Sequence, residues 1–271
     1  MSIKHFCIAL SMGLTLIGVS SCNYSGDQIR RIVRKEAGKD DFRDSKKWGK
    51  VVKQTLQVDE FTRIHLQGTA DIKFKQGEDF TVEANGNEKA IAYYDISVAD
   101  GTLSVNHKKG TPMNVPSIKL VITAPNLESI DVSGAGDVDL KDKAEFSGDL
   151  VIKISGAGDV EVEQVKCENF SIHISGAGDI TADKIKCKKA DINISGAGDM
   201  KADLKANDIN VDISGAGDAN LTVKCQNLNV IAGGTGEIDL KGECAHLKKQ
   251  VGGMASIDSR QLAIHEGIVI Q

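Results

Sequence analysis

Acidic side chains recur once every 19 to 22 residues through the second half of this 271-residue chain. If they stacked in register they would lie about 5 Å apart and repel one another, so each needs a compensating partner. A hard cation such as calcium, which takes several oxygen ligands, is one such partner. The repeat supplies no obvious further ligands, so we expect no cofactor and expect each carboxylate to accept backbone N–H groups within its own turn; a calcium column is the alternative. The members of this acidic column are Asp137, Asp159, Asp179, Asp199, Asp218 and Glu237.

A column of cysteines has the same period. Each lies eleven or twelve residues after the start of a repeat: Cys167, Cys187, Cys225 and Cys244. Ala206 takes the equivalent place in the repeat between the two pairs. A zinc site would need closely paired spacings and, as a rule, histidine. We therefore expect free thiols that pack as small buried hydrophobic residues, while a disulfide between Cys167 and Cys187 or between Cys225 and Cys244 stays open.

The titratable residues do not form the pattern of a catalytic centre. Cleavage of a polysaccharide needs acids that converge in one cleft, whereas the acids here are periodic. The histidines share no spacing, and only 4% of the residues are aromatic, which leaves few platforms for sugar rings. The net charge of −5 argues against nucleic acid as a partner. We expect a protein that is not an enzyme, with a polysaccharide-active enzyme as the alternative.

These residues belong to a pentapeptide repeat. Ser-Gly-Ala-Gly-Asp occurs five times unchanged from Ser133 to Asp218, and two altered copies follow at Gly233–Glu237 and Gly252–Ser256. Between the copies, apolar and polar residues alternate with period two, which indicates several short strands per repeat. The sequence therefore predicts an all-β fold, a parallel β-helix of about 19–22 residues per coil over residues 125–271, whose core is completed by stacking.

Residues 54–124 have strand patterns without a regular repeat. Ala99-Asp-Gly-Thr102 is a strong hairpin signal, because Asp-Gly tolerates the positive φ angles of tight turns. Gln67–Asp71 resembles an eroded copy of the pentapeptide. We expect an irregular, partly antiparallel β segment ahead of the coils.

The first residues have the character of a targeting signal. Residues 1–21 combine a short positive start with an apolar run that is too short to span a membrane, as in a signal peptide. Val19-Ser20-Ser21-Cys22 resembles a bacterial lipobox and predicts lipid attachment to Cys22, which would hold the protein on a membrane. Residues 22–53 are rich in Lys and Arg and predict a basic tether. Asn23, which is not an aspartate, favours the outer over the inner membrane.

The lipobox, the hairpin segment and the repeated Ile-x-Ile-Ser-Gly-Ala-Gly-Asp together resemble a bacterial family. It is the "putative auto-transporter adhesin" family with the head GIN domain, common among lipoproteins of the Bacteroidetes. The resemblance runs from about Val58 to the C-terminus. It implies a right-handed β-helix and a location in the cell envelope, and it brings no catalytic residues to this chain.

Taken together, we expect a lipid-anchored, non-catalytic binding or scaffold protein of adhesin type in the cell envelope. A calcium-stabilised structural surface protein is the remaining alternative. The expected partner, besides the membrane, is a glycan or another envelope protein. The ligand, the side of the membrane and the formation of a homo-oligomer stay open.

Overall fold

The computed structural model describes residues 47–270. The predicted signal peptide, Cys22 and nearly all of the predicted tether lie outside these residues. From Trp48 onward the chain forms one compact unit. Within it, no helix is both long enough and apolar enough to cross a bilayer.

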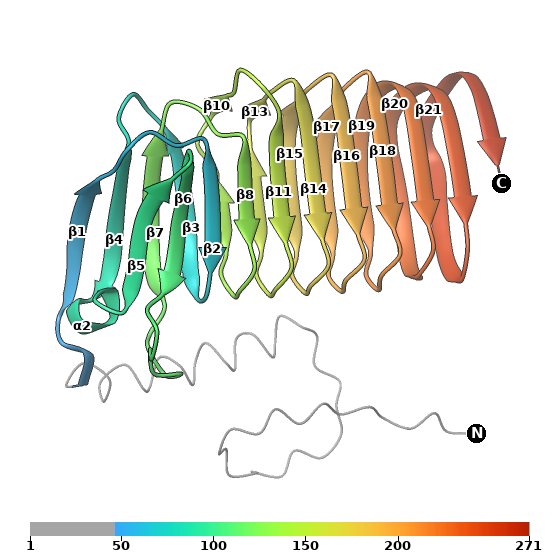
Figure 1. Cartoon of the computed structure of the whole chain (residues 1–271). Coiled ribbons are helices and arrows are strands. Elements are labelled where there is room, and N and C mark those ends of the chain that lie inside the picture. The colour runs from blue at the N-terminus through green and yellow to red at the C-terminus, as the bar shows by residue number, and fades with distance from the viewer. Residues whose placement is uncertain (1–46, 271) are drawn as a thin grey trace, which may run out of the picture. The chain divides into compact units, whose positions relative to one another are not determined.

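The repeats fold into a parallel β-solenoid in which each coil adds one strand to each of two faces (Figure 1). We call these faces the first and the second sheet, although the strands that run around the corners join them into one hydrogen-bonded sheet. The pentapeptide is the turn from the first sheet to the second, and a corner on the other side returns the chain to the first sheet. First-sheet strands are β8 (Ser129–Val132), β11 (Leu150–Ile154), β14 (Asn169–Ile174), β16 (Lys189–Ile194) and β18 (Asp208–Ile213). Second-sheet strands are β9 (Val138–Leu140), β12 (Val160–Glu163), β15 (Ile180–Lys186) and β17 (Met200–Lys205). Corner strands are β10 (Ala144–Glu145) and β13 (Val165–Lys166), and the long strands β19 (Ala219–Ala232), β20 (Thr235–Val251) and β21 (Met254–Ile270) run through both sheets.

Neighbouring coils are in register. In the first sheet Ile152 pairs with Ile130 on one side and with Ile172 on the other. In the near layer of Figure 1, β8, β11 and β14 point down while the chain advances toward the C-terminus at the right. A chain that descends in the near layer and rises in the far layer on this path is a right-handed coil, the usual hand for parallel crossovers.

The core is a set of aliphatic columns. One of them is at most 2% exposed at every level, and its members are Ile152, Ile172, Ile192, Val211 and Val230. A single coil has only one inward face and cannot bury it alone. Stacking removes that face from water, which stabilises the fold by about 25 cal/mol per Å² of apolar surface.

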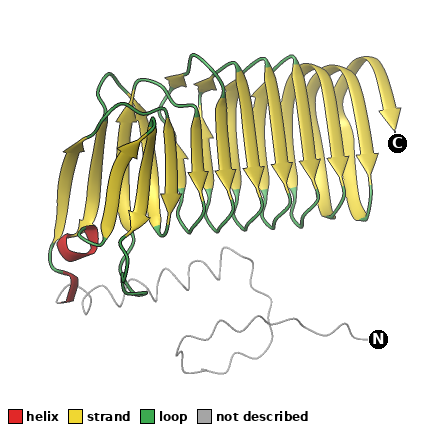
Figure 2. Ribbon diagram, viewed as in Figure 1, coloured by secondary structure: helices red, strands yellow, loops and turns green. Residues whose placement is uncertain are grey.

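The N-terminal segment covers one end of the solenoid, and its strands stack out of sequence order. The pair β2–β3 lies directly against β8 and β9, and the later pair β6–β7 lies on the far side of β2–β3. Outside these come antiparallel strands, with β4 against β7, β1 against β4 and β5 against β6. The strands are β1 (Val51–Gln57), β2 (Arg63–Gln67), β3 (Ala70–Gln76), β4 (Thr81–Asn87), β5 (Tyr94–Ala99), β6 (Thr102–His107) and β7 (Ile118–Ala124). Figure 2 shows this end of the stack with the short helix α2 (Glu88–Ile91).

The N-terminal segment is partly antiparallel and contains the predicted hairpin. The hairpin turns at Asp100 and Gly101, whose φ angles are 49° and 69°. Thr69, in the eroded copy of the pentapeptide, forms a parallel bridge with Ala135 in the first intact copy. The folded unit begins slightly before the expected boundary at 54, because β1 begins at Val51 and Trp48 is buried.

Candidate functional site

The pentapeptide turns stack so closely that both glycine positions must lack a side chain. A Cβ on Gly176 would lie 1.7 Å from the carbonyl oxygen of Gly156 in the preceding coil. A Cβ on Gly178, the second glycine of the same turn, would lie 2.0 Å from the carbonyl oxygen of Gly158. Between the glycines, Ala177 bridges to the matching alanine of the coil on each side. The repeated motif is therefore a tightly packed backbone column.

The acidic column accepts hydrogen bonds from the next coil. Asp137 Oδ1 accepts the backbone N–H of Asp159 at 3.0 Å, and the same contact recurs at every step until Glu237 N–H donates to Asp218 Oδ1 at 2.9 Å. Asp71 begins the column by accepting the N–H of Asp137 at 3.4 Å. The expectation that each carboxylate is satisfied within its own turn is wrong on this point. The donor is the backbone N–H of the equivalent acidic residue one coil further on.

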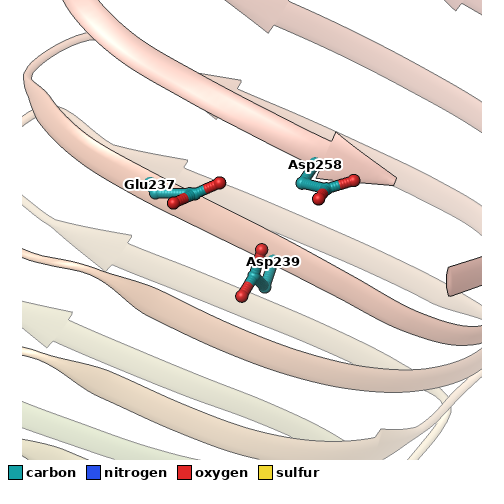
Figure 3. A group of neighbouring side chains, drawn as sticks. All are labelled: Glu237, Asp239 and Asp258. Atoms are coloured by element: carbon teal, nitrogen blue, oxygen red, sulfur yellow. The ribbon is translucent and has the colours of Figure 1, made fainter. Parts of the chain in front are cut away.

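Three acids converge at the C-terminal end of this column. Glu237, Asp239 and Asp258 each place a carboxylate oxygen within 4.8 Å of the others (Figure 3). The Nε of Arg260 donates to the two oxygens of Asp258 at 3.0 Å and 2.9 Å and, with the backbone N–H of Arg260, lowers the pKa of Asp258 to about 2. Arg260 thus supplies a positive charge to this acidic cluster. A carboxyl group with so low a pKa is ionised at neutral pH and is unsuited to act as a general acid.

The cysteine column consists of four free thiols. Cys167 and Cys244 are buried, and Cys187 and Cys225 are partly buried. Burial raises the pKa of Cys167 and Cys225 to about 12 and that of Cys187 to about 11. The thiolate is the form that attacks electrophiles and binds metals, so these protonated side chains act as packing residues, as expected.

The cysteine column is also the floor of an open groove of about 440 Å³, which we call the basic groove. Small side chains line the floor, and longer ones from the residues just before and just after each floor position form the two rims. Floor residues are Cys187, Ala206, Cys225 and Cys244. One rim contains Lys186, Lys205, Lys224 and Glu243, and the other contains Asn207, Gln226 and Ala245. His265 also lines the groove, and its Nε2 lies 3.8 Å from Glu243 Oε2. The groove therefore runs from coil to coil, along the solenoid.

Four lysines stack in register, and all but the first of them lie on one rim of the basic groove: Lys166, Lys186, Lys205 and Lys224. We call them the lysine column, and all four are exposed. Acids close its two ends. The Nζ of Lys166 lies 3.1 Å from Glu145 Oε2, and the Nζ of Lys224 lies 2.5 Å from Glu243 Oε1. Within the part of the chain that the structure describes, Lys186 and Lys205 form no ion pair.

Several other outward side chains pair with a side chain of the neighbouring coil. The amide of Asn210 donates to Asp191 at 2.8 Å, and the amide of Asn227 donates to Asp208 at 2.6 Å. Lys201 pairs with Asp183 of the preceding coil at 3.7 Å. The middle of the lysine column differs from these, because like charges are neighbours there without a compensating group.

The lysine column was not predicted from the sequence. Its signal is the dipeptide Lys-Cys, which recurs at 166–167, 186–187 and 224–225, with Lys205-Ala206 between. A lysine beside an inward residue is ordinarily a solvated outward position, and periodicity alone does not tell which lysines lack a carboxylate partner.

A smaller groove of about 290 Å³ crosses the first sheet beside the pentapeptide serines. Lys153, His173 and Asn193 come from three successive coils at equivalent register positions. The side chains differ from level to level, so this groove lacks the uniform charge of the basic groove.

Comparisons with known proteins agree with this architecture. A family model described as "Putative auto-transporter adhesin, head GIN domain" matches residues 60–224 and 201–269. A crystal structure described as a "putative adhesin" from Bacteroides fragilis is 23% identical, with a TM-score of 0.67 over 77% of this chain and 96% of that one. A second "putative adhesin", from Parabacteroides distasonis, is 19% identical, with a TM-score of 0.61 over 82% and 98% of the two chains. A protein of the same organism described as a "putative lipid binding protein" is 18% identical, with a TM-score of 0.54 over 82% and 97%. No curated protein matches the sequence.

Proposed function

The chain belongs to the "Putative auto-transporter adhesin, head GIN domain" family, and from this premise we propose that it is a lipid-anchored, non-catalytic binding protein of adhesin type in the cell envelope. The observation that carries the proposal is the basic groove. Equivalent residues of successive coils line it, so it repeats the same contacts along the solenoid. A repeated, open surface suits an extended ligand, which would be held at several levels at once.

The chemistry of the described surface favours binding over catalysis. The acidic column is engaged in hydrogen bonds between coils, and the thiols of the groove are protonated. Among the convergent acids, Arg260 holds Asp258 as an ionised carboxylate, so Asp258 does not supply the protonated carboxylic acid that glycoside cleavage needs. A calcium-dependent role for the acidic column receives no support from its contacts, because one oxygen of each aspartate already accepts an N–H group.

Membrane attachment through Cys22 is part of the proposal and rests on the lipobox. It predicts that metabolic labelling of cells with radioactive palmitate marks the wild-type protein. Cys22→Ser should abolish the label, whereas the control Cys7→Ser, within the predicted signal peptide, should retain it. Label that persists in Cys22→Ser would overturn the anchoring proposal. Density fractionation of the same membranes tests the outer membrane, where we expect the labelled protein.

Binding is tested separately with the full-length protein on an array of glycans and envelope polymers. We expect saturable binding to a glycan whose length is unchanged after incubation. Shortened products would favour a polysaccharide-active enzyme. If the protein binds only another envelope protein and no glycan, it is a scaffold protein and not a glycan-binding one.

A further inference from the structure

We propose that the lysine column is the binding site for an acidic polysaccharide, a polymer with a carboxylate at regular intervals. This inference rests on the proposed function and names the ligand class of the basic groove. It starts from the two central lysines. Lys186 and Lys205 are in-register neighbours on adjacent coils, and both lack an ion-pair partner in the described part of the chain.

Stacked coils hold these ammonium groups on backbones about 4.8 Å apart. Like charges at that distance repel one another, and the sequence provides acids only at the two ends of the column, at Glu145 and Glu243. A bound chain of carboxylates would supply the missing charge at each intermediate level. It would also repeat along the same line as the lysines.

The other surfaces of the groove fit a carbohydrate. The small floor residues Ala206 and Cys225 leave room beside the long lysine stems. Across the floor, Asn207 and Gln226 are exposed amides that can both donate and accept hydrogen bonds, as sugar hydroxyl groups require. One rim would thus bind carboxylates and the other hydroxyl groups.

Other polyanions fit less well. Side chains on one face of an extended peptide repeat every two residues, at about 6.6 Å, which does not match a spacing of about 4.8 Å between the lysines. Single-stranded nucleic acid is held by aromatic rings that stack on successive bases, whereas the groove is lined by one ring, that of His265, at its Glu243 end. An anionic bilayer is a plane, whereas the lysines form a single row along the coils.

The test is binding of full-length protein to polygalacturonate, with the methyl ester of the same polymer as the uncharged ligand control. We expect binding to polygalacturonate that weakens steeply with added salt, and no binding to the ester. The variant Lys186→Gln/Lys205→Gln should bind about tenfold more weakly, through the loss of two exposed ion pairs. The control Lys141→Gln/Lys201→Gln removes the same charge from lysines paired with Glu161 and Asp183, and it should bind as the wild type does. Circular dichroism of all variants checks that the fold is retained.

Several outcomes would overturn the proposal. These are equal binding of the ester, equal weakening in both double variants, or binding through the lysine column to polyglutamate or to phosphatidylglycerol vesicles but not to polygalacturonate. The two proposals fail separately. If both double variants still bind another glycan as the wild type does, the lysine column is not the binding site, but the adhesin function stands. If polygalacturonate is bound and shortened, the lysine column remains the binding site, but the protein is an enzyme.

Discussion

The packing of the pentapeptide turns makes a sharp prediction for Gly196→Ala. The new Cβ would lie 1.8 Å from the carbonyl oxygen of Gly176, about 1.6 Å short of the 3.4 Å at which ordinary contact begins. That same oxygen accepts the backbone N–H of Ala197 at 3.0 Å, and the N–H of Gly178 donates to the oxygen of Ala197 at 3.1 Å. The coil must move away to admit the methyl group, and both hydrogen bonds then lengthen.

The expected loss of stability follows from these two terms. Overpacking costs about 1–3 kcal/mol, and two weakened backbone hydrogen bonds cost about 1 kcal/mol each. We expect Gly196→Ala to lower the free energy of unfolding by about 3–5 kcal/mol. The matched control is Gly148→Ala at an open corner, where a Cβ meets nothing within 4 Å and the change should stay within about 1 kcal/mol of the wild type.

The assay is urea unfolding of the full-length variants, followed by far-ultraviolet circular dichroism. A midpoint for Gly196→Ala that falls well below both the control and the wild type is the predicted result. If Gly196→Ala lies within about 1 kcal/mol of Gly148→Ala, the coils are not packed through the glycine positions, and the account of the repeat is wrong.

Four further predictions concern the charged and titratable groups. Asp199→Ala should lower the free energy of unfolding by about 1–2 kcal/mol in urea titrations, because it leaves the N–H of Asp218 without its acceptor, whereas Asp199→Asn should stay close to the wild type. Chelator should leave the melting temperature unchanged in calorimetry; a fall of many degrees would assign calcium to the acidic column. Alkylation of Cys225, followed by peptide mass spectrometry, should be slow in the native protein until the pH approaches the pKa of this thiol, about 12. The free energy of unfolding should fall as pH rises above about 8.5, because the thiol ionises in the unfolded chain before it ionises in the folded one. Arg260→Gln should raise the pKa of Asp258 from about 2 toward about 3.9 in an NMR titration. The stabilisation by the Asp258–Arg260 pair is present above the pKa of the unfolded aspartate and is lost as pH falls toward 2. An unchanged pKa in the variant would contradict the assignment of the low pKa to Arg260.

The coils could be predicted from the sequence because their information is local and repeated. The alternation at Ile152 and Ile154, followed by a fixed glycine-rich turn, sets the inward face of each strand, and stacking follows. The order of the N-terminal strands had no comparable signal. The pairing of β2 with β8 joins Ile64 to Ile130 across a long stretch of sequence, and no local pattern states that β6 lies on the other side of β2.

The site was predictable in its positions more than in its contacts. The acidic and cysteine columns follow directly from the spacing of the repeats. The donor to Asp137 was assigned to the wrong coil, because the direction of a side chain relative to the next coil depends on the stacked backbone. The lysine column was missed for a related reason. Its distinguishing property is that Lys186 and Lys205 are in-register neighbours of like charge without ion-pair partners, and this appears only when all neighbouring coils are in place.

The most direct test of the account is one incubation of the full-length protein with polygalacturonate, in which bound polymer and polymer length are both measured. We expect saturable, salt-sensitive binding with the polymer length unchanged. Bound polymer that becomes shorter with time would contradict it and would identify an enzyme.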